Sequence, residues 1–182
     1  MWFPQYQTYF GVHLDHHVEI WGGRSFNKIL VLEYPDPNLV CTGTTDATGS
    51  VQIDFLYPLL VQSKYFLDGV MDGHVTFKAD ATAGRTCTGY AVSLKKLSDA
   101  GIETNLGTMS YTFGATYSFT ANQYLTVPIY MQLSKQPVNE NEKLFLRVSL
   151  VTAMTANQIV LSHYNDSSVP DIKIRIPYAP TG

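Results

Sequence analysis

Hydrophobic and polar residues alternate along much of this chain, which is the pattern of strands with one buried and one solvated face. Leu146 lies in the clearest run, and we expect it on a buried central strand. The alternation also predicts that the intervening Asp54, Phe145 and Arg147 face solvent. The inward positions of the alternating segments are Val51, Ile53, Phe55 and Tyr57; Val75, Phe77 and Ala79; Tyr90, Val92 and Leu94; Leu144, Leu146, Val148 and Leu150; and Ile172, Ile174 and Ile176.

Turn residues separate these segments. The polar stretch 98–101 is typical of a hairpin between strands at 90–95 and 108–113. Segment 58–71 fits either a short helix or two strands broken near residues 68–69, and we favour the strands. With about nine short strands and no alternation with helices, the sequence predicts an all-β antiparallel sandwich of the jelly-roll type.

The N-terminal residues 1–25 differ from the rest, and we interpret them as an extended arm before a single domain at 26–182. Five of the first ten residues are aromatic, which is too apolar for a solvated tail. The arm therefore packs either on its own sandwich or on a neighbouring subunit. We expect residues 1–12 to contact a neighbouring chain. The interface residues are predicted to be Trp2, Phe3, Tyr6, Tyr9 and Phe10.

Composition narrows the functional classes. The chain has 182 residues, a net charge of −3, 15% charged residues and 13% aromatic residues. This balance excludes disordered, coiled-coil and collagen-like chains, and the missing basic run argues against nucleic acid. No apolar run reaches the roughly 18–20 residues of a membrane span, and the first residues lack the basic and apolar regions of a signal peptide, so we expect no leader. Cys41 and Cys87 are therefore expected to be free thiols.

The densest candidate for chemistry is the histidine-rich segment near the N-terminus. His13, Asp15 and His17 share one face of a strand and could ligate a metal ion, with His74 or His163 completing the set. The alternative is a polar strand face or a subunit contact. No nucleophile elbow, paired carboxylates in one cleft or phosphate loop is recognisable. The sequence thus predicts no enzymatic activity and no cofactor.

Exposed tyrosines offer a second kind of site, because sugars stack on aromatic rings. Candidates on or near predicted strands are Tyr111, Tyr117, Tyr124 and Tyr130. The alternative is that these rings fill the core or a subunit contact. Sugar therefore remains a candidate ligand.

The order of segments in the second half is similar to a known class of viral protein. Strand 90–94 is followed by the hairpin 98–104, then by strand 142–148 and the closing segment 172–178. This layout resembles the jelly-roll capsid decoration (cement) and tail accessory proteins of tailed phages and related viruses, over residues 75–178. The resemblance implies a non-enzymatic, oligomeric virion component that binds a major capsid or tail protein. The alternative is a carbohydrate-binding or adhesion module of a cell surface or tail fibre.

Overall fold

The computed structural model describes residues 7–13, 20–21, 24–25, 28–31, 50–56, 64–79, 85–152, 159–161 and 173–180. Within these ranges all regular elements are strands, so the predicted all-β class is confirmed. The strands are β1 (Gln7–His13), β2 (Ile20–Trp21), β3 (Arg24–Ser25), β4 (Lys28–Val31), β5 (Ser50–Leu56), β6 (Tyr65–Ala79), β7 (Arg85–Leu97), β8 (Glu103–Phe119), β9 (Tyr124–Val138), β10 (Lys143–Thr152), β11 (Ile159–Leu161) and β12 (Lys173–Pro180).

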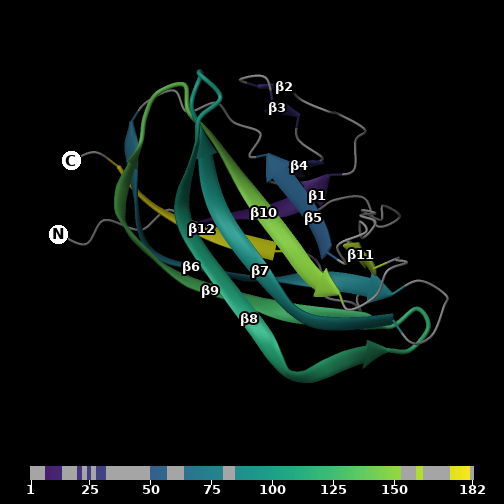
Figure 1. Cartoon of the computed structure of the whole chain (residues 1–182). Helices are drawn as coiled ribbons and strands as arrows, with labels where there is room; N and C mark the ends of the chain where they lie inside the picture. Colours follow the sequence, from purple (N-terminus) through teal and green to yellow (C-terminus); the bar gives the residue numbers. More distant parts are fainter. Residues whose placement is uncertain are drawn as a thin grey trace.

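The strands form two layers (Figure 1). Sheet I has the order β1–β12–β6–β9, with β11 also pairing with β6, and sheet II has the order β4–β5–β10–β7–β8. The pairs β7–β8, β6–β9, β5–β10 and β1–β12 are nested along the chain and alternate between the sheets. This nesting is the wrapping of a jelly roll.

Strand β1 connects the two sheets. Residues 7–10 pair antiparallel with β12, and residues 11–13 pair antiparallel with β4. This part of the predicted arm is extended, as expected, and it lies within the sheets of its own domain. The expectation that the first residues contact a neighbouring chain stays a prediction.

The core lies between the sheets and follows the alternation of the sequence. Leu146 is fully buried, as predicted, and so are its inward neighbours on β10. Period-2 geometry places alternate residues of facing strands in one apolar layer. The main cluster comprises Phe55, Leu67, Met71, Val75, Phe77, Cys87, Tyr90, Val92, Leu94, Leu106, Phe119, Val127, Ile129, Met131, Leu133, Val138, Leu144, Leu146, Val148, Leu150, Ile174 and Ile176.

The prediction of two strands broken near residues 68–69 is wrong. Strand β6 continues through Asp68 and Gly69, with a register shift against β9 between Leu67 and Gly69. Gly69 has a φ of 120°, which side chains rarely adopt, so glycine allows the strand to continue through an irregularity. Partners on both edges of β6, namely β9 on one side and β12 and β11 on the other, also hold it extended.

The predicted hairpin between β7 and β8 is confirmed. The Gly101 N–H donates to the Ser98 carbonyl oxygen at 2.9 Å, and the Ile102 N–H donates to Ser98 Oγ at 3.1 Å. Gly101 has a φ of 77°, which glycine tolerates without strain. Within the described ranges, no helix has the length and apolar character that crossing a membrane requires.

Candidate functional site

The outer face of sheet II carries a row of polar side chains across four strands. Asp54 on β5, Arg147 on β10, Ser93 on β7 and Thr108 on β8 are successive cross-strand neighbours. Their alternation with inward apolar residues places them all on one face. Pairing thus unites residues that are distant along the chain.

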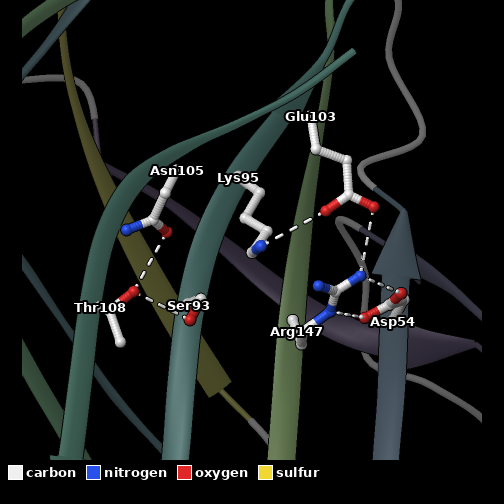
Figure 2. Close-up of polar contacts among 7 residues, drawn as sticks. All are labelled: Asp54, Ser93, Lys95, Glu103, Asn105, Thr108 and Arg147. Carbon is white, nitrogen blue, oxygen red and sulfur yellow. Dashed lines mark hydrogen bonds and ion pairs between the residues drawn. The ribbon is translucent and has the colours of Figure 1, made fainter. Parts of the chain in front are cut away.

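An ion network joins Asp54, Arg147, Glu103 and Lys95 on this face (Figure 2). Arg147 donates from Nε to Asp54 Oδ1 at 2.8 Å and from Nη2 to Asp54 Oδ2 at 3.0 Å. Arg147 Nη2 also lies 3.4 Å from Glu103 Oε1, and Lys95 Nζ lies 3.3 Å from Glu103 Oε2. The bidentate Arg147–Asp54 pair fixes both planar groups, since two parallel hydrogen bonds define their relative orientation.

Hydrogen bonds among Ser93, Thr108 and Asn105 continue the row toward β8. Thr108 Oγ1 donates to Asn105 Oδ1 at 3.1 Å, and it lies 3.0 Å from Ser93 Oγ. Because the Thr108 hydroxyl has one hydrogen, which goes to Asn105, Ser93 must donate to Thr108. The three side chains are thereby held in one orientation (Figure 2).

Two of the positions predicted to face solvent are buried, which corrects the sequence interpretation. Phe145 joins Leu56 and Leu97 in a second apolar cluster on the outer face of sheet II, and Asp54 is only 4% exposed. The Arg147 guanidinium lies 5.6 Å from the centre of the Phe145 ring, so cation–π attraction links the cluster to the ion network. Phe145, Leu56, Leu97 and Asp54 are therefore shielded from solvent although they lie on the outer face of sheet II.

The outer face of sheet I presents a different surface. Tyr130 on β9 is 68% exposed and is the cross-strand neighbour of Asp72 on β6. Arg175 on β12 donates from Nε to Asp72 Oδ1 at 2.6 Å, with a second contact from Nη2 to Asp72 Oδ2. An exposed ring thus lies beside a bidentate ion pair.

A row of aromatic rings fills the space where the edges of β8 and β9 approach each other. Ring centres are 5.8 Å apart for Tyr90–Tyr111 and 5.6 Å apart for Tyr111–Phe113. The row continues through Tyr117 to Phe119. The Tyr90 hydroxyl donates to the Pro128 carbonyl oxygen of β9 at 2.9 Å. Burial, and secondarily the charge of Tyr111, raise the pKa of Tyr90.

The tyrosines that were candidates for sugar binding differ in their exposure. Tyr117 is half-buried, and Gln123 Nε2 donates to its hydroxyl at 2.7 Å, so its ring belongs to the packed row. Tyr111, at 54% exposed, and Tyr130 remain accessible to a ligand.

The metal and arm residues lie largely beyond the described side chains. His13 ends β1, whereas Asp15 and His17 are outside the described residues. Tyr9 and Phe10 belong to β1, and the other predicted arm residues, Trp2, Phe3 and Tyr6, are outside it. Among the side chains that the structure describes, no group of three or more His, Cys, Asp or Glu residues is placed to hold a metal ion.

Cys87 is a free, fully buried thiol, as predicted, while Cys41 is outside the described residues. Burial raises the pKa of Cys87 to about 12. The thiolate is the nucleophilic form of cysteine, so Cys87 is a packing residue and not a nucleophile.

Sequence reasoning missed the Asp54–Arg147 pair. Both residues were visible at polar positions of alternating segments. What linked them was the pairing of β5 with β10, whose residues are 93 positions apart in this contact. A predicted strand order would have been the signal that identified them.

No protein-family model and no curated protein matches this sequence. The fold is similar to part of a CocE/NonD family hydrolase from Staphylococcus aureus, with a TM-score of 0.65 and 12% identity over 97% of this chain. An aminopeptidase from a marine sediment Thaumarchaeota archaeon matches 95% of this chain with a TM-score of 0.64 and 8% identity. An α-amino acid ester hydrolase matches 96% with a TM-score of 0.55 and 9% identity.

The chain spans about a third of each of these proteins, namely 37%, 36% and 34% of their lengths. These similarities contradict the prediction of no enzymatic activity, because the three solved structures named above, whose matches cover 95–97% of this chain, are hydrolases. Structures of infectious bursal disease virus match with TM-scores of only 0.32 and 0.28, values too low to carry an argument.

Proposed function

We propose that this chain is the β-sandwich portion of a hydrolase and acts beside a separate catalytic portion. The observation that supports the proposal is the fold likeness over 95–97% of the chain to parts of three hydrolases. The match covers only 34–37% of those proteins, so most of each lies outside the shared fold. A β-sandwich domain is compatible with many functions, and its partner determines which one it serves.

The described side chains suit a binding or positioning role in such an assembly. The Asp54–Arg147 pair and its neighbours form a largely buried network in which each group is held by at least one hydrogen bond, and such a network suits a positioning role. Cys87 is excluded as a nucleophile by its burial and raised pKa. The proposal therefore does not assign a catalytic role to Cys87.

The proposal is tested by purifying the tagged chain from its source under native conditions. The preparation is assayed with a simple acyl ester, an α-amino acid ester and an aminoacyl amide. We expect hydrolysis of at least one substrate, and its removal from the extract when the tagged chain is captured. Lack of hydrolysis in all fractions that contain the chain would refute the proposal.

Saccharide binding is a second candidate, favoured by the exposed Tyr130 ring beside the Asp72–Arg175 pair. Sugar rings stack on exposed aromatic faces, while fixed carboxylate and guanidinium groups offer hydrogen bonds to hydroxyls. Affinity electrophoresis in gels that contain soluble polysaccharides measures such binding. We expect Tyr130→Ala to abolish retardation and Tyr117→Phe, in the packed row, to preserve it. Equal retardation of both variants would contradict a site at Tyr130.

A virion location remains a third proposal, supported by the jelly-roll strand order. Capsid proteins, lectins and cupins all use this wrapping, so the topology by itself does not choose between them. Mass spectrometry of purified particles tests the idea: the chain should copurify with a major capsid or tail protein at a fixed ratio. Its recovery only from particle-free fractions would exclude this location.

A further inference from the structure

The two edge strands that meet along one side of the sandwich differ in their protection. Strand β9 carries Pro128, Lys135 and Pro137, which are residue types that hinder pairing with another strand. Residues 104–119 of β8 contain neither a charged residue nor a proline. Among the strands that the structure describes, β7 alone pairs with β8. Residues 104–119 of β8 therefore form a long edge without charged side chains or proline.

The regular part of this edge is residues 107–112. This segment pairs with residues 89–94 of β7 without a shift, whereas register shifts lie beyond both of its ends. The Tyr111 carbonyl oxygen lies close to the position that a Cβ atom on Gly89 of β7 would occupy. Tyr111 therefore directs its backbone groups toward β7. Backbone direction alternates along a strand, so Thr108, Ser110 and Thr112 direct their N–H and C=O groups to the free edge.

Most side chains beside these groups are exposed. Tyr111 is 54% exposed at the edge, and Met109 next to it is partly buried. Thr108, Ser110 and Thr112 are exposed on the opposite face. An added strand would cover the tyrosine ring and satisfy the outward backbone groups together.

We propose that β8 pairs antiparallel with β8 of a second copy of this chain, with Ser110 opposite Ser110. In this register Thr108 exchanges two backbone hydrogen bonds with Thr112 of the second copy, because both direct their backbone groups outward. Tyr111 then lies opposite Met109 of the second copy on the same face, where the Met109 sulfur already accepts a hydrogen bond from the Tyr130 N–H of its own β9 at 3.2 Å.

A second copy fits this edge better than a charged partner. The segment has no charge, so antiparallel self-pairing brings no like charges together. The two-fold arrangement also uses the same patch on both subunits, as isologous dimers do. Sheet II would then continue across the dimer. The inference is independent of the proposed hydrolase role.

Sedimentation velocity over a concentration series tests this dimer with the full chain. Ser110→Lys places two ammonium groups opposite each other at the two-fold axis, and we expect dimerisation to weaken by about tenfold or more. Ser118→Lys is the matched control, because it makes the same change at an exposed position of β8 outside the regular segment. We expect the control to dimerise like the original chain.

Amide hydrogen exchange gives a second readout that needs no variant. The amides of Thr108, Ser110 and Thr112 should exchange more slowly as protein concentration rises. Three results would overturn the proposal: a monomer throughout the concentration series, equal weakening by both lysine variants, or exchange at these amides that does not depend on concentration.

Discussion

Arg147 holds the outward network of sheet II together, because it bonds both Asp54 and Glu103. Arg147→Met keeps an aliphatic stem but leaves the Asp54 carboxylate, with 5% of its side chain exposed, without the guanidinium. Removing one member of a buried ion pair costs roughly 3–5 kcal/mol. We expect a loss of this size in the free energy of unfolding, measured by urea denaturation.

Two variants separate this effect from simple loss of contacts. Adding Asp54→Leu to Arg147→Met removes the buried carboxylate that has lost its guanidinium. The double variant should therefore be more stable than Arg147→Met alone. Lys95→Met breaks only the more exposed pair with Glu103, and we expect a cost of up to about 1 kcal/mol. If the double variant is the less stable one, the cost does not come from a buried charge.

The contacts of Glu142 predict how the free energy of unfolding changes with pH in the acid range. Burial alone would raise its pKa, but hydrogen bonds from Lys96 and the Asn139 N–H, with the Lys96 charge, leave the pKa below its usual value. A lowered folded-state pKa stabilises the protein above the unfolded-state value, about 4.3, and this stabilisation is lost as pH falls through the folded-state pKa.

We therefore expect Glu142→Gln to flatten the acid limb of the stability curve, measured by urea denaturation at a series of pH values. Glu140→Gln is the matched control, since it makes the same change at an exposed position of the same turn. If the two variants have identical acid limbs, the contact between Lys96 and Glu142 is not the source of the dependence.

At the scale of elements, Gly107 allows β8 to approach β9. A Cβ atom at this position would overlap the buried Leu133 side chain and lie 3.1 Å from Met131 Sδ. Gly107→Ala should cost roughly 1–3 kcal/mol, as overpacking does. Gly114→Ala on the same strand meets no atom within 4 Å and should be neutral or stabilising by up to about 1 kcal/mol. Thermal denaturation measures both, and shifts of the same sign would contradict this account.

The strands also show which structural features could be predicted from the sequence and which could not. Period-2 alternation located Leu146 and the β7–β8 hairpin, because side-chain direction and turn chemistry are local. The burial of Phe145 and Asp54 escaped prediction, since it depends on what covers the outer face of sheet II. The continuity of β6 escaped it too, because pairing partners on both edges override the local signal for a turn at Gly69.

At the scale of the whole molecule, the missing catalytic motif led to the wrong functional expectation. Motif searches detect residues that perform chemistry, whereas the likeness to hydrolases lies in the fold and covers only about a third of their length. The sequence identified Tyr130 as a candidate, but it did not identify the ion pair beside that ring. Tyr130 is exposed beside Arg175 because β6 lies between β9 and β12, and that order exists only in the folded sheets.

The N-terminal segment gives the last prediction, because β1 pairs with both sheets. Deleting residues 1–6 leaves β1 intact, so we expect the circular-dichroism β signal and the melting temperature to persist. Deleting residues 1–13 removes the strand that pairs with β12 in sheet I and β4 in sheet II. Both partners would then have a free edge, which favours unfolding or aggregation.

This pair of deletions separates the part that β1 plays in the fold from any part that residues 1–6 play in assembly. It also tests the predicted contact with a neighbouring chain separately from the fold. If residues 1–6 carry that contact, their deletion impairs assembly, measured by sedimentation, while the melting temperature is kept. A shorter chain without residues 1–13 that melts like the full protein would show that β1 is dispensable, and the role of the strand in joining the sheets would have to be abandoned.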